Sequence, residues 1–184
     1  YTILNKLKFS SENEFSLKIK NKFKVKNFKI SSNLKLKELS FKNFGYLKFF
    51  FPNVKENISL LNNDIKINFE NNKYSVKGNG DILIQTKNDE IEYQFNNTND
   101  KIEFNTFLKN KENPFEIDFL NFEKKKNSEM EVRIDGFKEL NKDIVINQIS
   151  LKEKKNEIKF KNLILRKNKI FDIEEINLDY LDKN

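Results

Sequence analysis

Apolar and polar residues alternate along much of this chain, and this period of two restricts its fold more than any other feature. One clear run places Ile65, Ile67 and Phe69 on either side of Lys66 and Asn68. Successive side chains of a β-strand point to opposite faces, so such a run predicts a strand with one buried face and one solvated face. Similar runs cover residues 15–19, 91–95, 115–119, 130–134 and 158–160. The pattern predicts an all-β fold.

Clusters of Asn, Asp and Lys separate the alternating runs at intervals typical of an antiparallel meander. This spacing predicts about fifteen short strands, joined in sequence order. Pro52 and Pro114 fall at predicted strand boundaries, and Gly78-Asn79-Gly80 predicts a bulge inside a longer strand. Leu34–Phe44 fits either a short helix or two strands, and we expect little helix elsewhere because the chain contains no Ala.

The whole chain, 1–184, is interpreted as one repetitive β-sheet segment of a larger protein, with a sub-boundary near 44–62. The sequence contains neither an N-terminal signal segment nor the run of about 18 apolar residues that a membrane-spanning helix needs. If the protein is anchored to a membrane, we expect the anchor to lie outside this segment.

The apolar face of so many strands must be covered, and amphipathic helices to cover it are scarce in the sequence. The sheet could close on itself as a β-sandwich, which is the usual outcome for such a face. It could instead curl into a groove or open half-barrel whose apolar inner face binds a ligand. The candidate groove residues are Ile65, Ile67, Phe69, Ile82, Ile84, Ile91, Tyr93, Phe95, Ile102, Phe104, Phe115, Ile117, Phe119, Met130, Val132 and Ile134.

Catalytic and metal-binding chemistry finds little support in the sequence. The chain has no His and no Cys, and its adjacent carboxylates point to opposite faces of a strand. We therefore predict a protein that is not an enzyme, with no catalytic residue, metal or cofactor. The net charge of +7 comes from Lys, and lysines from Lys6 to Lys26 predict a basic outer face. Only Arg133 and Arg166 supply guanidinium groups, so we do not expect nucleic-acid binding.

The segment from Asn62 to Asn184 resembles the AsmA-like family of Gram-negative envelope proteins, in particular its large YhdP-type members. The resemblance lies in amphipathic strand patterns rather than in invariant residues. It covers Asp64–Phe69, Tyr74–Ile82, Pro114–Phe122 and the closing Ile173–Tyr180.

This resemblance implies a periplasmic protein anchored in the inner membrane, with a long curled sheet that carries phospholipid between the inner and outer membranes. The partners would be phospholipid acyl chains lying in the groove. On this reading, replacing Phe95, Phe115 or Phe119 by Asp removes bound lipid at a smaller cost in stability than a core substitution. The alternative is a self-closed β-domain that serves as a structural, adhesion or assembly module without a ligand.

Overall fold

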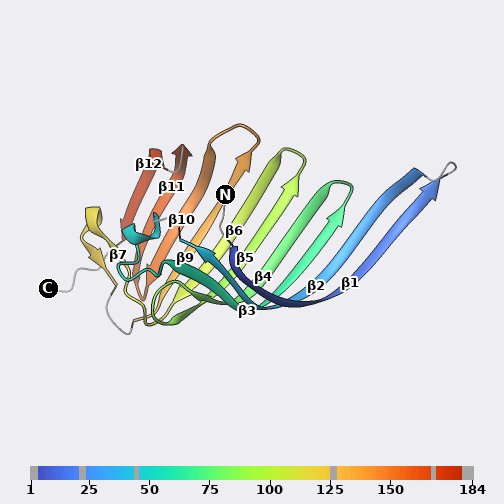
Figure 1. The fold of residues 1–184 in the computed structure, drawn as a ribbon. Coiled ribbons are helices and arrows are strands. Elements are labelled where there is room, and N and C mark those ends of the chain that lie inside the picture. Colours follow the sequence, from blue (N-terminus) through green and yellow to red (C-terminus); the bar gives the residue numbers. More distant parts are fainter. Residues whose placement is uncertain (1–3, 21–23, 44–45, 125–127, 167–168, 180–184) are drawn as a thin grey trace.

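Most of the alternating segments form one antiparallel sheet of ten strands, in which neighbouring strands follow each other in sequence apart from the inserted β7 and β8 (Figure 1). A computed structural model of the protein describes residues 4–20, 24–43, 46–124, 128–166 and 169–179. The sheet contains β1 (Leu4–Lys20), β2 (Lys24–Lys42), β3 (Asn57–Glu70), β4 (Lys73–Leu83), β5 (Asn88–Thr98), β6 (Lys101–Asn110), β9 (Met130–Glu139), β10 (Ile144–Glu153), β11 (Asn156–Arg166) and β12 (Lys169–Asp179).

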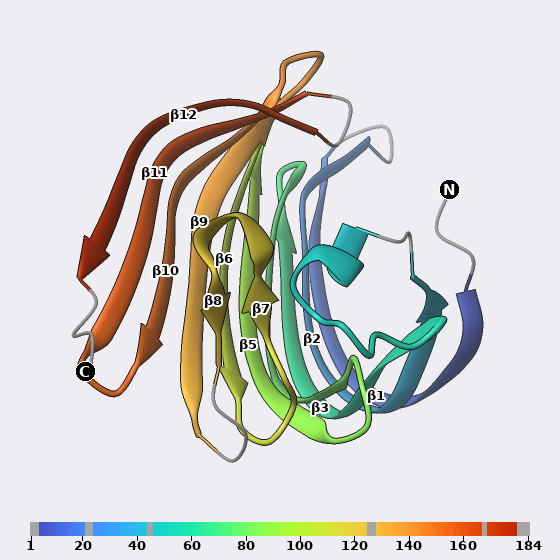
Figure 2. The same cartoon turned by 90° about the vertical axis from the view of Figure 1, so that its left-hand side faces the viewer.

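The predicted all-β antiparallel meander is confirmed, and its strands are fewer and longer than expected. β1 has 17 residues and β2 has 19. β1 and β12 are the two edges of the sheet, which is not closed into a barrel. The ribbon curls into a trough (Figure 2). The curled, open form of the prediction is therefore correct, and the closed sandwich is not formed.

Neither proposal for Leu34–Phe44 is correct. Residues from Leu34 to Lys42 are the second half of β2 and pair with β3 from Ile65 back to Asn57. β1 pairs with the other side of the same stretch, so its backbone groups are bonded in the sheet on both sides. This pairing outweighs any local preference for a helix. Phe44 lies outside the described residues.

The bulge predicted at Gly78-Asn79-Gly80 occurs on the neighbouring strand. Both glycines lie within β4, while the register of β3 against β4 shifts between Leu61 and Asp64. Asn62, inside that shift, has a positive φ of 51°. A Cβ atom on Gly80 would lie 2.6 Å from the Asn62 carbonyl oxygen. Glycine is required here because the bulged backbone comes close to β4.

Two connections leave one end of the strands and fold back into the trough (Figure 2). The first joins β2 to β3 and contains η2 (Tyr46–Phe49). The second joins β6 to β9 and contains β7 (Glu116–Ile117), η3 (Asp118–Leu120) and β8 (Phe122–Glu123). We call segments 46–56 and 111–124 together the plug. The amide of Glu116 donates to the carbonyl of Phe50 at 3.1 Å, which joins the two segments.

The plug supplies the missing cover for part of the apolar face. The ring of Phe115 contacts three other rings of the plug, with centroid distances of 5.8 Å to Phe50, 5.2 Å to Phe51 and 6.4 Å to Phe122. Phe51, Phe115, Ile117 and Phe122 are buried in one hydrophobic cluster with residues of the sheet. The core of the protein is therefore a layer between the plug and the trough.

Candidate functional site: the concave face

The concave face is built from laterally paired apolar residues, because directly paired residues of antiparallel strands point to the same side. One row runs from Ile67 on β3 through Val76, Phe95 and Phe104 to Gly136 on β9. A parallel row includes Ile65, Gly78, Tyr93, Thr106 and Ile134. The triplets Ile65/Ile67/Phe69 and Ile91/Tyr93/Phe95 thus share one face, as predicted.

Coverage of this face changes along each strand. Toward the plug, the inner residues are buried, as for Leu108 and Val132 at 8% and 6% exposure. Toward the opposite end, with the turns at 71–72, 99–100 and 141–142, the inner residues are only partly covered, and Phe95 is 37% exposed. We call this second part the open half. Its central residues are Ile65, Ile67, Phe69, Tyr74, Val76, Tyr93, Phe95, Ile102, Phe104 and Ile134.

The predicted groove residues therefore divide into two groups. Eight of the predicted residues lie in the open half: Ile65, Ile67, Phe69, Tyr93, Phe95, Ile102, Phe104 and Ile134. Ile91 is half-buried and packs against the core cluster, as do Phe104 and Ile134 at the border of the open half. Ile82, Ile84, Met130 and Val132 are fully buried in that cluster.

The prediction that Phe115, Ile117 and Phe119 form part of the sheet face is wrong. These residues belong to the plug, in which β7 contains Ile117 and η3 contains Phe119. Phe115 and Ile117 are 3% and 1% exposed, so they cover the concave face instead of lining it. The alternation at 115–119 led to a wrong prediction because β7 followed by the 3-10 turn η3 shows the same apolar–polar pattern as one longer strand. The side chain of Phe119 lies outside what the structure describes.

Aromatic rings lie over glycines on the floor of the open half. A Cβ atom on Gly78 would collide with the Tyr93 ring, and one on Gly136 would collide with the Val145 carbonyl oxygen and lie 2.8 Å from the Phe104 ring. The glycines thus leave room for rings that lie close to the sheet backbone. Burial raises the pKa of the Tyr93 hydroxyl to about 12, because the phenolate would lose hydration there.

We expect Tyr93 to ionise later than an unfolded tyrosine, which titrates near pH ~10. The folded protein favours the neutral phenol of Tyr93. The stabilisation that this preference contributes is fully present below pH ~10 and is lost as the pH rises through the folded pKa of about 12. An alkaline titration followed by phenolate absorbance should show one late step, which Tyr93→Phe removes. Persistence of the late step in that variant would assign it to another tyrosine.

Buried polar groups hold the base of the plug. Lys124, which is 1% exposed, donates from Nζ to the carbonyls of Lys111 at 3.1 Å and Ser128 at 2.7 Å. These two residues lie at the beginning and end of the second connection, so one side chain joins both ends. Ser128 in turn donates from its hydroxyl to Glu153 on β10.

A second set of bonds ties the same base to β5. The Asp89 carboxylate accepts from the amide of Lys111 at 3.1 Å and from the Asn113 side chain at 2.7 Å. Burial raises the pKa of Asp89, and these two bonds partly oppose that shift. Burial also lowers the pKa of Lys124, against the attraction of Glu153 and Asp89. We call Asp89, Asn113, Lys124, Ser128 and Glu153 the neck cluster.

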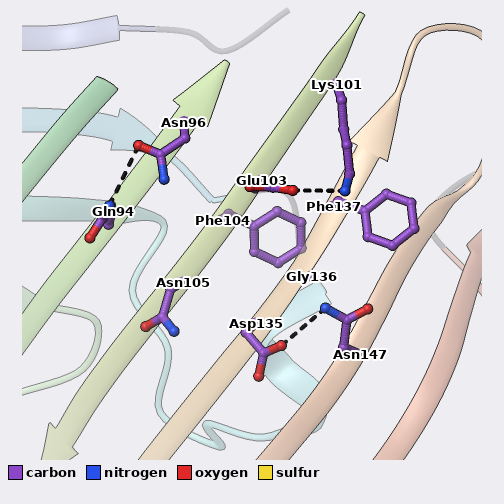
Figure 3. A pocket seen from close by; sticks show the side chains of 10 residues that line it. All are labelled: Gln94, Asn96, Lys101, Glu103, Phe104, Asn105, Asp135, Gly136, Phe137 and Asn147. Atoms are coloured by element: carbon purple, nitrogen blue, oxygen red, sulfur yellow. Dashed lines mark hydrogen bonds and ion pairs between the residues drawn. The ribbon is translucent and has the colours of Figure 1, made fainter. Parts of the chain in front are cut away.

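The convex face carries a polar depression of about 520 Å³ (Figure 3). Its polar groups are largely bonded to one another, for example Asn147 to Asp135 at 3.1 Å and Lys101 to Glu103 at 2.7 Å. Lys101 also lies over the Phe137 ring, 4.4 Å from its centroid. The depression offers no nucleophile paired with a base, and we assign it no chemistry.

Comparison with protein-family models, curated proteins and solved structures finds no match to this chain. The concave face must therefore be interpreted from its own geometry. Among the described residues, no cluster of three or more acidic side chains could hold a metal ion. No helix in the same residues is long and apolar enough to cross a membrane.

Sequence reasoning missed the plug and the neck cluster. The run Phe49-Phe50-Phe51 breaks the alternation, and both prolines of the chain, Pro52 and Pro114, lie in the plug. Together these signals mark the two long connections. Nothing in the sequence distinguishes the buried Lys124 from its neighbours in the run Lys124-Lys125-Lys126.

Proposed function

We propose that the open half of the concave face binds phospholipid acyl chains. The observation that carries this proposal is the incomplete cover of a continuous apolar surface. Val76, Phe95 and Phe104 lie side by side on three neighbouring strands, and none of them is fully buried. Extended exposed apolar patches on proteins usually mark a partner or ligand.

The chemistry of such a site is passive. Each CH₂ group that leaves water for an apolar surface contributes ~0.8 kcal/mol, so an acyl chain gains affinity in small equal steps. The rings of Tyr93 and Phe104 lie close to glycines of the neighbouring strands, and no single polar contact would hold the acyl chain in one place. A lipid could therefore move along the surface while its headgroup stays in water.

The wider proposal is that this chain is one segment of a protein that carries phospholipid between the inner and outer membranes of a Gram-negative envelope. The support is the open curled sheet together with the resemblance of Asn62–Asn184 to the AsmA-like family. The periplasmic location and the anchor outside this segment belong to the same proposal and rest on that resemblance alone.

The plug favours a second candidate, a structural β-domain without a ligand. Four of its phenylalanine rings, those of Phe50, Phe51, Phe115 and Phe122, pack together over one end of the strands. On this alternative, the residues of the open half form the partly covered edge of a hydrophobic core that needs no ligand.

Lipid binding can be tested with two Phe→Asp variants on neighbouring strands. Phe95 points into the open half, whereas Phe107 on β6 lies on the convex face, where Arg133 stacks on its ring at 4.4 Å. Mass spectrometry of the purified folded protein should detect phospholipid on the wild type and on Phe107→Asp. Phe95→Asp should carry several-fold less, because a carboxylate on the floor would have to be desolvated by the acyl chain.

Two results would contradict this proposal. Wild-type protein that carries no lipid, and takes none up from phospholipid vesicles, would favour the structural β-domain. An equal loss of lipid in Phe95→Asp and Phe107→Asp would place any lipid away from the concave face.

A further inference from the structure

The hairpin of β1 and β2 extends beyond β3 at the open end of the trough (Figure 1). The pairing of β2 with β3 stops at Lys29 and Glu70. Past that pair, β2 continues against β1 and has no strand on its other side. We call segments 17–20 and 24–28 the arm. Its boundary is set by the end of β3, inside the chain, and not by the outer side of β1.

The arm region contains most of the excess positive charge of the protein. Residues 15–30 include six of the 35 Lys and Arg residues and none of the 28 Asp and Glu residues. They account for six of the seven net charges, so the rest of the chain is close to neutral. Two lysine pairs are directly opposite in register, Lys18 with Lys26 and Lys20 with Lys24. Like charges in this position weaken a strand pair, so an anionic partner would stabilise the arm.

The other face of the arm is apolar and exposed to solvent. Alternation along β1 places Leu17 and Ile19 on the concave side and the lysines of β1 on the convex side. Leu17 is 41% exposed and Ile19 is 60% exposed. On β2, the ring of Phe28 contacts the ring of Phe69 at a centroid distance of 6.1 Å. Because Phe69 belongs to the open half, the apolar face of the arm continues that surface.

An anionic lipid surface fits both faces of the arm at once. An amphipathic segment in the membrane interface buries its apolar side chains at the boundary of headgroups and acyl chains, while long lysine side chains reach the phosphates. Each lysine near such a surface adds to the attraction. A nucleic acid would contact the lysines and leave Leu17 and Ile19 in water. Residues 15–30 also contain no Arg, the side chain that binds phosphate in a bidentate manner.

We propose that the arm docks on an anionic phospholipid bilayer, lying flat with its apolar face in the headgroup region. Docking would bring the open half next to the lipid surface, because the rings of Phe28 and Phe69 connect the two. The proposal goes beyond the binding of acyl chains and does not require it.

Vesicle binding by charge variants tests the role of the lysines. Lys18→Gln/Lys26→Gln removes one register pair from the arm. Lys66→Gln/Lys77→Gln removes a matched register pair of exposed lysines from β3 and β4. In cosedimentation at low ionic strength, the wild type should bind vesicles of phosphatidylcholine with phosphatidylglycerol, and added salt should release it. The arm variant should bind about tenfold or more weakly, and the control variant about twofold or less.

A tryptophan reporter tests whether the apolar face enters the membrane. The chain contains no Trp, so Ile19→Trp and Leu140→Trp each have a single indole. Leu140 lies in the turn between β9 and β10 and is a matched control, since it is 65% exposed. The anionic vesicles should shift the emission of Ile19→Trp to shorter wavelength and leave that of Leu140→Trp unchanged. Circular dichroism should show that all four variants keep the β structure of the wild type.

A wild type that does not bind the anionic vesicles at low ionic strength would overturn the proposal. An equal loss of binding in the two lysine variants would also overturn it, as would an unshifted emission of vesicle-bound Ile19→Trp. Tighter binding to a single-stranded oligonucleotide than to the vesicles would assign the lysines to a nucleic acid instead. Uptake of lipid from pure phosphatidylcholine vesicles is measured separately, so docking and acyl-chain binding can fail independently.

Discussion

Replacing Phe115 by alanine is expected to lower the free energy of unfolding by about 3–5 kcal/mol, the usual cost of removing a buried aromatic ring. Phe115 is 3% exposed and lies at the centre of the ring cluster that joins the two plug segments, within the hydrophobic cluster shared with the sheet. Its loss would leave a cavity between the two plug segments, next to the rings of Phe50 and Phe51. Urea denaturation followed by circular dichroism measures the effect.

Phe95→Ala is the matched control for this experiment. Phe95 is 37% exposed, and its inner surface faces the open half rather than the plug. We expect a loss of about 1 kcal/mol or less, because partly solvated sites leave little cavity behind. Equal losses for the two variants would mean that the open half is as tightly packed as the core. That result would also weaken the case for an acyl-chain site.

Lys124→Met is expected to lower the free energy of unfolding by about 2–4 kcal/mol, because hydrogen bonds from charged donors contribute roughly 1.5–3 kcal/mol and the nearby carboxylates lose their counter-charge. Methionine keeps most of the aliphatic stem, so the change tests the ammonium group. The carbonyls of Lys111 and Ser128 would lose their donor inside the neck cluster. Hydrogen exchange should accelerate most in 111–124, since the base of the plug is released.

Lys155→Met controls for the removal of a lysine charge. Lys155 lies in the exposed turn between β10 and β11 and forms no ion pair among the described residues. Its replacement should change the stability by less than about 0.5 kcal/mol. If Lys124→Met were equally neutral, the neck cluster would hold together without its cation, and packing of the phenylalanine rings alone would retain the plug.

The plug also limits how the concave face can be used. It covers the end of the trough from which the two long connections emerge, and the neck cluster fixes it there. A bound acyl chain is therefore expected in the open half, next to Tyr93 and Phe104. The plug and an acyl chain would cover the same apolar face by the same means, the former with phenylalanine rings and the latter with methylene groups.

The sequence by itself determined the antiparallel β architecture and, for most alternating runs, the face of the sheet on which their residues lie. Alternation at Ile65–Phe69 and Ile91–Phe95 is local, and a strand has only two faces, so the pattern is enough to assign them. The antiparallel order followed from turn clusters only a few residues long. These features depend on neighbours in sequence, which is why they could be predicted.

The tertiary structure alone decided what covers the apolar face and where it stays open. Phe115 and Phe95 have similar alternating surroundings in the sequence, yet one belongs to the plug and the other to the floor. Their difference depends on whether a connection folds back into the trough, a long-range packing choice that spacing does not encode. The same holds for Lys124, whose burial depends on carbonyls at both ends of its loop. Burial follows from contacts between distant segments, and only the assembled sheet and plug bring those contacts together.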